Sequence, residues 1–435
     1  MEDEKPSLPS DETLIVTTLS SEWKSSKGGL STFIRELAIQ LAKHRNVEVY
    51  VYLPKCNEED KKVARSQSVH LIEAEERPGY EPDDWLASLP KGHRPHCLIG
   101  HGLHLGRQIP FIKQHHDCKW VQVVHTAPEE LGMYESYEEA VCKGEQKQQA
   151  EVKLCALADQ VVAVGPKLTD IYSRSLSFIS KDVINLTPSI FSEFLNVKQA
   201  TEERRKFFVL VFGRGDREDF KLKGYDIANQ AIAELEDSSY HLMFVGAPAG
   251  KEDEVKDKLL QYGITPSQLT VRRFKESRED LAKLFCEVDL SLMPSRTEGF
   301  GLTALEALSA GLPVLVSGNS GLGEALKKVP TGHFHVVDSD DPKEWANAIS
   351  VVRKKGRKVR LEEAELLRKK YASQYSWQKQ CDCLVETMLR LSFGKINVFA
   401  LPLRLWARDS CKVMVENAEG LINCHPIEID RINLI

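Results

Sequence analysis

A strand, a glycine-containing loop, a short helix and a second strand follow one another within residues 288–325. The stretch opens with the apolar run 288–293, which has the length and composition of a buried strand. The loop PSRTEGFG leads into the helical segment LTALEALSA, and Gly311 is expected to end that helix before a second apolar run, LPVLVS. Two buried strands joined by a helix predict a parallel βαβ unit, which constrains the fold more than any other part of the chain.

The loop of this unit has the composition of a phosphate site. Gly299 and Gly301 allow the backbone to approach a ligand closely, at the point where the next helix presents unpaired amides and the positive end of its dipole. Glu298 lies just before this helix start and Glu306 about one turn inside the helix. Carboxylates accept hydrogen bonds from hydroxyl groups, so a ligand with both a diphosphate and sugars, such as a sugar nucleotide, suits the site.

The same alternation of apolar runs and helical segments extends through most of the chain. A first series contains TLIVTTL, VEVYVYL, SVHLIEA, HCLIGHG, KWVQVVHT and QVVAVG, and a second contains FFVLVFG, YHLMFVG and LTVRRF before the central unit. The polar, charged segment 189–206 separates the two series. Since 435 residues exceed what one hydrophobic core usually accommodates, the pattern predicts two α/β domains, each with a doubly wound parallel sheet.

The segment EGFGLTALE, followed by ALSAGLPVL, resembles the donor-site signature of the retaining glycosyltransferases of the GT-B fold, often called family 4. The resemblance covers roughly residues 12–391 and implies two Rossmann-like domains that face each other across a cleft. We expect an acceptor domain over 12–190 and a nucleotide-sugar donor domain over 205–374. A helix over 375–391 would cross back to the first domain, and the tail 392–435 has no assigned role.

The resemblance implies roles for several residues of the second domain. Glu298 would hold the hydroxyls of the donor sugar and Glu306 those of the ribose. The other donor-binding residues would be Gly299, Phe300, Gly301 and Leu302, and further candidates at the start of the next helix are Gly321 and Glu324.

A charged loop follows the run FFVLVFG, and the family carries two basic residues there that bind the donor diphosphate. Arg214 and Lys223 match these positions. Arginine can bind a phosphate through two parallel hydrogen bonds, and lysine acts as a point charge. Arg217 and Lys221 lie in the same loop, and either is an alternative.

The first domain contributes a glycine pair and two histidines. Gly28 and Gly29 precede a predicted helix, and the resemblance implies that such a glycine pair contacts the donor or the acceptor, so we expect both among the donor-binding residues. Ser31 is expected to be the N-cap of the helix. His101 and His125 each follow an apolar run, at the strand ends where ligands collect in doubly wound sheets. The family places a histidine of a motif like VHT against the donor sugar, which favours His125 as the catalytic histidine over His101.

The activity implied is transfer of a sugar from a nucleotide-sugar donor to an unidentified hydroxyl acceptor, with retention of configuration and without a bound metal or a cofactor. Positive charge from Arg214 and Lys223 would replace the metal, and an oxygen of the leaving phosphate would act as the base. Two other functions stay open. One is a non-catalytic module that binds nucleotide sugars or glycans, and the other is a glycosidase that uses Glu298 and Glu306 as its carboxylate pair.

Composition excludes several classes of partner. A net charge of −6 provides no electrostatic footprint for nucleic acid. The acidic leader MEDEKPSLPSDE is unlike a signal peptide, and no uncharged apolar run approaches the ~20 residues of a membrane span. The ten cysteines match neither a disulfide framework nor zinc-ligand spacing, so we expect reduced thiols and a cytoplasmic location.

Overall fold

All strand pairs of both sheets in the computed structural model are parallel, as the alternating apolar runs predicted. The structure describes residues 13–24, 28–135, 138–215, 220–274 and 277–394. The described residues up to Ser392 belong to one compact unit, which contains both sheets. Nearly all of the tail 392–435 lies outside the described residues, as does Arg217. The predicted domain limits stay predictions.

The first sheet has seven strands in the order β3-β2-β1-β4-β5-β6-β7. This order reverses at β1 and β4, and in doubly wound sheets ligands bind beside such a switch point, at the carboxyl ends of the strands. The strands are β1 Leu14–Leu19, β2 Val47–Leu53, β3 Val69–Glu73, β4 Cys97–His101, β5 Lys119–Val124, β6 Gln160–Val164 and β7 Val183–Leu186. The α-helices between them are α1 Gly29–Leu41, α2 Glu58–Ser66, α3 Gly102–Gly106, α4 Ile109–Lys113, α5 Pro128–Gly132, α6 Ala140–Leu157 and α7 Pro166–Leu176.

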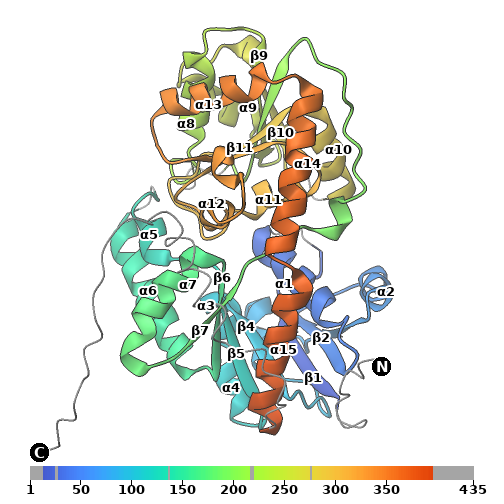
Figure 1. Cartoon of the computed structure of the whole chain (residues 1–435). Coiled ribbons are helices and arrows are strands. Elements are labelled where there is room, and N and C mark those ends of the chain that lie inside the picture. The colour runs from blue at the N-terminus through green and yellow to red at the C-terminus, as the bar shows by residue number, and fades with distance from the viewer. Residues whose placement is uncertain (1–12, 25–27, 136–137, 216–219, 275–276, 395–435) are drawn as a thin grey trace, which may run out of the picture. The chain divides into compact units, whose positions relative to one another are not determined.

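The second sheet has six strands in the order β10-β9-β8-β11-β12-β13 and reverses at β8 and β11 (Figure 1). The βαβ unit predicted within residues 288–325 therefore begins with one of the two strands at the switch point of this sheet. The strands are β8 Phe207–Phe212, β9 Tyr240–Ala247, β10 Leu269–Arg273, β11 Leu290–Met293, β12 Val314–Ser317 and β13 Val336–Val337. The helices are α8 Tyr225–Glu234, α9 Glu252–Leu260, α10 Arg278–Glu287, α11 Leu302–Ser309, α12 Gly321–Lys327 and α13 Pro342–Lys354.

Local departures from the sequence predictions are small and have physical causes. Helix α1 begins earlier than expected: Gly28 is its N-cap, Ser31 lies buried inside it, and no side chain caps it. The predicted Ser31 cap is therefore wrong. The short strand β7 was not predicted, because its four residues, VINL, include the exposed Asn185 and lack a sustained apolar run, and only Leu186 is buried.

Two long helices end the described chain. Helix α14 (Arg357–Gln374) follows the second sheet, and α15 (Trp377–Phe393) lies against the first half (Figure 1). Gln380 of α15 exchanges two hydrogen bonds with Thr187, accepting from its amide at 2.7 Å and donating to its carbonyl at 2.9 Å. The Trp377 ring lies 6.3 Å from the ring of Phe33 in α1. These contacts join the carboxyl end of the second half to the first half.

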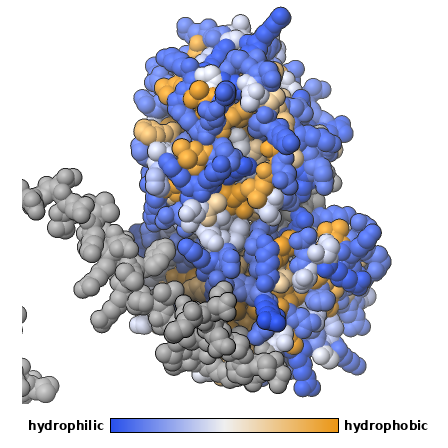
Figure 2. Space-filling model, turned by 45° about the vertical axis from the view of Figure 1, so that its right-hand side comes forward, coloured by the Kyte–Doolittle hydropathy of each residue, from blue (hydrophilic) through white to orange (hydrophobic). Residues whose placement is uncertain are grey.

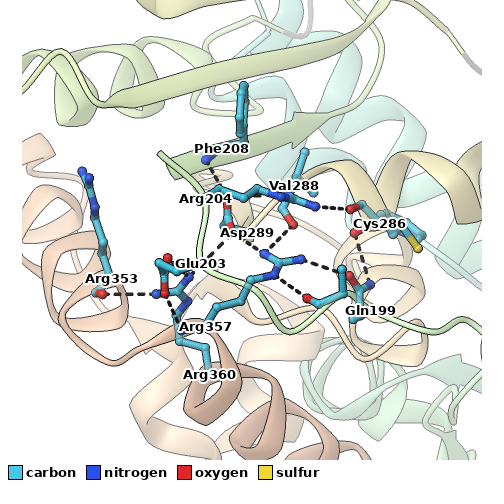
Figure 3. A network of polar contacts seen from close by, with 12 residues as sticks. Gln199, Glu203, Arg204, Phe208, Cys286, Val288, Asp289, Arg353, Arg357 and Arg360 are labelled. Carbon is cyan, nitrogen blue, oxygen red and sulfur yellow. Dashed lines mark hydrogen bonds and ion pairs between the residues drawn. The ribbon is translucent and has the colours of Figure 1, made fainter. Parts of the chain in front are cut away.

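A buried ionic network ties the linker before β8 and the start of α14 to the base of the second sheet. Asp289, at the amino end of β11, forms ion pairs with Arg357, Arg360 and Arg204 (Figure 3). Its second oxygen also accepts the backbone amide of Phe208 at 2.9 Å. Asp289 and the two α14 arginines are almost completely buried, so their charges depend on one another for compensation.

The surface has the character of an ordinary folded protein. Hydrophilic residues cover most of the face in Figure 2, and hydrophobic residues form separate patches. Among the residues that the structure describes, no helix has both the length and the apolar composition needed to cross a membrane.

Candidate functional site

A cavity of about 730 Å³ lies between the two halves of the described unit, at the carboxyl ends of their central strands. Residues from both halves line the cavity, so the switch points of the two sheets face the same cavity. The predicted site residues that line the cavity are Gly28, Gly29, His125, Arg214, Lys223, Glu298, Phe300, Gly301, Leu302 and Glu306.

Four other candidates lie away from the cavity lining: Gly299, Gly321 and Glu324 of the second half, and His101 of the first. Gly299 packs behind it, where a Cβ atom would lie 2.2 Å from the carbonyl oxygen of His125. Gly321 packs in turn against the carbonyl of Gly299. Glu324 is half-buried in α12, and burial raises the pKa of its carboxyl, with a further contribution from Asp170.

Two helices begin at the cavity, one from each half. The N-cap of α1 is Gly28 and that of α11 is Gly301, and neither helix has a side-chain cap or an acidic residue in its first turn. Gly301 has φ 104°, a left-handed conformation that strains other residues. The first amides of both helices are therefore left for a ligand, and the dipoles favour an anion such as a diphosphate.

Glu298 and Lys223 form an ion pair at the cavity wall. Lys223 Nζ lies 2.6 Å from Glu298 Oε2, although the two residues belong to loops 75 positions apart. Both side chains are partly exposed, at 26% for Lys223 and 21% for Glu298. A ligand can reach the ammonium and the carboxylate together, so the pair can contact a phosphate and a neighbouring sugar hydroxyl.

Glu306 forms a second ion pair, with a residue that the sequence did not single out. Arg278, at the start of α10, donates from Nη1 to Glu306 Oε1 at 2.6 Å. Burial raises the pKa of the Glu306 carboxyl, and the Arg278 guanidinium opposes that rise. Burial acts to lower the pKa of Arg278, but Glu306 and Glu193 outweigh it, and its pKa stands above the ordinary value. Arg278 lines the cavity, as Glu306 does.

The two histidines bind each other, and only one reaches the cavity. His101 is fully buried, and its Nδ1 lies 3.0 Å from His125 Nε2. The other ring nitrogen of His101, Nε2, lies 2.8 Å from the hydroxyl of Thr18. Burial lowers the pKa of His125 to about 3 and also lowers that of His101. His125 is therefore neutral at physiological pH, so it offers a hydrogen bond and no positive charge.

Of the remaining cationic candidates that the structure describes, Arg214 lines the cavity and Lys221 does not. Arg214 lines the cavity at the end of β8, and its carbonyl accepts the hydroxyl of Tyr225 at 2.9 Å. Lys221 does not line the cavity, and its carbonyl accepts from Arg296 at 2.6 Å. Within the described ranges, no group of three or more His, Cys, Asp or Glu side chains is placed to hold a metal ion.

An aromatic wall of the cavity was also missed from the sequence. The rings of Phe212 and Phe274 are stacked, with centroids 5.7 Å apart and an angle of 15° between their planes. Both residues line the cavity, beside Ser277 and Arg278. A flat apolar surface next to hydrogen-bonding groups suits a nucleobase.

Comparison with known proteins gives the chain a family. The model of the family described as "Family 4 Glycosyltransferase in conflict systems" matches residues 14–384. D-inositol 3-phosphate glycosyltransferase from Rhodococcus jostii is 32% identical over 173 residues, which are 38% of this chain and 37% of the relative. The enzyme of the same name from Corynebacterium urealyticum is 27% identical over 290 residues, 62% of this chain and 65% of the relative. The chain thus spans less than two thirds of the length of either.

Solved structures share the fold at low sequence identity. Sucrose-phosphate synthase from Thermosynechococcus elongatus superimposes with a TM-score of 0.69 at 19% identity, over 88% of this chain and all of that one. HepE from Anabaena, solved in complex with UDP and glucose, gives a TM-score of 0.64 at 15% identity, over 86% and 98% of the two chains. The two parallel sheets have the arrangement of the GT-B fold, and the chain belongs to the family 4 glycosyltransferases of conflict systems.

Proposed function

We propose that the protein transfers a sugar from a nucleotide-sugar donor to a hydroxyl acceptor, with retention of configuration and without a bound metal or a cofactor. The observation that carries this proposal is the Lys223–Glu298 pair at the mouth of α11, where an ammonium, a carboxylate and unpaired amides face one cavity. The ammonium and the amides can bind the diphosphate of a donor, and the carboxylate can accept hydrogen bonds from the hydroxyls of its sugar.

The donor would lie mainly against the second half. Arg214, Lys223 and the first amides of α11 bind the diphosphate, and Glu298 accepts hydrogen bonds from the sugar hydroxyls. Glu306 accepts from the ribose. The stacked rings of Phe212 and Phe274 support the base. HepE, which shares the fold, was solved with UDP, so uridine donors are the first to test.

The reaction requires stabilisation of charge on the leaving diphosphate. As the bond between the sugar C1 and the phosphate oxygen breaks, Lys223 and Arg214 neutralise the growing negative charge. The acceptor oxygen bonds to C1 on the same face, and its proton passes to the departing phosphate oxygen. One well-placed donor in such a site contributes about 3 kcal/mol to lowering the barrier, which corresponds to about 100-fold in rate.

The glycosidase alternative is not favoured by the geometry. Such an enzyme needs one carboxyl group that is protonated and ready to act as an acid. Glu298 and Glu306 each form an ion pair within the protein, with Lys223 and Arg278, so neither carboxyl group stands free to protonate a leaving group. The other alternative, a binding module, predicts nucleotide binding without turnover.

Product analysis by NMR tests the proposal. Wild-type protein is incubated with UDP-, GDP- and ADP-glucose, each with a panel of polyol and glycan acceptors and with EDTA. We expect one nucleotide class to yield an α-linked product, or α-glucose from slow hydrolysis, at a rate that EDTA leaves unchanged. A β-linked product, or turnover that EDTA abolishes, would contradict the proposed mechanism, and binding without turnover would favour the binding module.

Matched variants connect the activity to the site. Lys223→Met and Glu298→Gln should each lower turnover by about 100-fold. Lys355 and Glu363 form a similar pair, with 2.7 Å between Nζ and Oε2, but lie outside the cavity lining. Lys355→Met and Glu363→Gln should therefore leave turnover within twofold of wild type. Equal losses in both pairs would contradict the assignment.

A further inference from the structure

A buried lysine connects the two halves of the described unit beside Glu298. Lys167 lies in the first turn of α7, in the first half, and is only 5% exposed. Its Nζ donates to two residues of the second half: to Thr297 Oγ1 at 2.6 Å, and to the side chain and carbonyl oxygens of Asn319 at 2.9 and 3.1 Å. A lysine is buried to this extent only when its charge is compensated.

Glu130 of α5 provides that compensation. Its Oε2 lies 2.7 Å from Lys167 Nζ and also accepts the hydroxyl of Thr297 at 2.7 Å. Burial acts to raise the pKa of Glu130, but the Lys167 ammonium and the Thr297 hydroxyl bring it below the ordinary value. Lys167 and Glu130 from the first half and Thr297 and Asn319 from the second therefore form one closed set of contacts, which we call the latch.

The latch holds the backbone that carries Glu298. Thr297 directly precedes Glu298, whose amide donates to the carbonyl of Asn319 at 3.2 Å. The same carbonyl accepts from Lys167, and the Asn319 side chain donates to the carbonyl of Arg296 at 2.5 Å. The loop that contains Thr297 and the loop that contains Asn319 are thus hydrogen-bonded to each other, and Lys167 donates hydrogen bonds to both.

Close contacts on either side of the latch leave this loop little room to move. A Cβ atom at Gly299 would lie 2.2 Å from the carbonyl oxygen of His125, and one at Gly165 would lie 2.5 Å from the Phe300 ring. Both contacts join the first half to the loop 297–301. The position of Glu298 therefore depends on residues of the opposite half, although its ion-pair partner Lys223 belongs to its own half.

We propose that Lys167 and Glu130 are positioning residues, which fix the loop 297–301 so that Glu298 meets the donor sugar only while the two halves are in contact. This inference rests on the proposed function, in which Glu298 holds the sugar. Most of the diphosphate contacts do not depend on the latch, because Arg214 and Lys223 lie outside the loop 297–301, and the amides beyond the N-cap Gly301 are fixed by helix α11 itself. Loss of the latch should consequently lower turnover far more than nucleotide affinity, since a displacement of about 1 Å can cost about 100-fold in rate.

The first test separates turnover from binding. Lys167→Met and Thr297→Val should lower the kcat for release of UDP from UDP-glucose by about 100-fold, while the Kd for UDP measured by calorimetry changes less than threefold. Thr297→Ser, which keeps the hydroxyl, should restore kcat to within threefold of wild type. Lys355→Met, which changes a partly exposed lysine outside the cavity lining, provides the control. Parallel losses in kcat and UDP affinity, or an unchanged kcat in Thr297→Val, would overturn the proposal.

A second test does not depend on the donor. Hydrogen exchange in the peptide covering 296–301 should be at least tenfold faster in Lys167→Met than in wild type, while exchange in β9 stays unchanged. Equal acceleration in both peptides would indicate general destabilisation, and no acceleration would show that the latch does not hold the loop; either result overturns the proposal. Wild-type protein that neither binds UDP nor cleaves UDP-glucose would contradict a uridine donor, and the exchange result would still decide the role of the latch.

Discussion

Replacement of Arg278 by methionine should remove the cation that pairs with the buried carboxyl group of Glu306 in the cavity. Glu306 is 4% exposed, and Arg278 binds it at 2.6 Å. Methionine preserves much of the side-chain volume but leaves Glu306 without this cation. Breaking a buried ion pair from one side costs about 3–5 kcal/mol, because the other charge is left without compensation.

The predicted loss depends on pH in a defined direction. Burial already raises the pKa of Glu306 above its unfolded value, and removal of Arg278 raises it further. The contribution of this group to stability is full below the unfolded pKa of about 4.5 and is lost as the pH rises through the folded pKa. As the pH rises past the folded pKa of Glu306 in the wild type, the variant should go on losing about 1.4 kcal/mol of unfolding free energy per pH unit until its own, higher folded pKa is reached.

Urea unfolding between pH 5 and 8 measures both effects. Arg278→Met should be less stable than wild type by about 3 kcal/mol at pH 7 and less so at pH 5. The double variant Arg278→Met/Glu306→Gln should recover about 2 kcal/mol and lose the added pH dependence. Arg273→Met, which removes an ion pair with Glu252 at the surface, should leave the unfolding free energy close to that of wild type. A cost below 1 kcal/mol for Arg278→Met, with the pH profile of wild type, would refute this reasoning.

Three further predictions concern other parts of the fold. Asp289→Ala should destabilise the protein by about 3–5 kcal/mol in urea unfolding, because Arg357 is left as an uncompensated buried cation; a loss below 1 kcal/mol would contradict the network's role. Burial raises the pKa of Glu151 to about 7, so its stabilising contribution is full below about pH 4.5 and is lost as the pH rises through 7. The unfolding free energy of the wild type should fall by about 3 kcal/mol between pH 4.5 and 8 because of this group. Glu151→Gln should flatten this part of the plot of unfolding free energy against pH, and a plot like that of wild type would contradict the prediction. Gly165→Ala should displace the Phe300 ring and lower UDP-glucose turnover by about tenfold, whereas equal turnover would show that the ring adapts.

The fold could be predicted well because buried parallel strands have a local signature. The runs that became β1, β2, β5 and β8 are continuously apolar or nearly so, and glycine loops separate several from their helices. Strand β7 lacks that signature, since its pairing with β6 rather than its own composition makes it a strand. The N-cap of α1 was misplaced for a similar reason, because either a serine or a glycine is suitable for that position.

The candidate site could be predicted only where a motif is local. Glu298, Gly301 and Glu306 lie within one short segment, so their spacing carries information. Arg278 contacts Glu306 across 28 positions, and Lys167 contacts Thr297 across 130. Partners so far apart are defined by the packing of the two halves and have no local pattern, so both residues emerged only from the structure.

The most direct test of the account is a calorimetric titration of UDP-glucose, in the presence of EDTA, into wild-type protein and the Lys223→Met and Lys355→Met variants. The account predicts one binding site per chain in wild type and in Lys355→Met, and an affinity lowered at least tenfold in Lys223→Met. Binding that all three proteins share equally would place the nucleotide sugar outside the cavity. A wild type that binds neither this donor nor its GDP and ADP counterparts would contradict the central claim that the cavity is a nucleotide-sugar site.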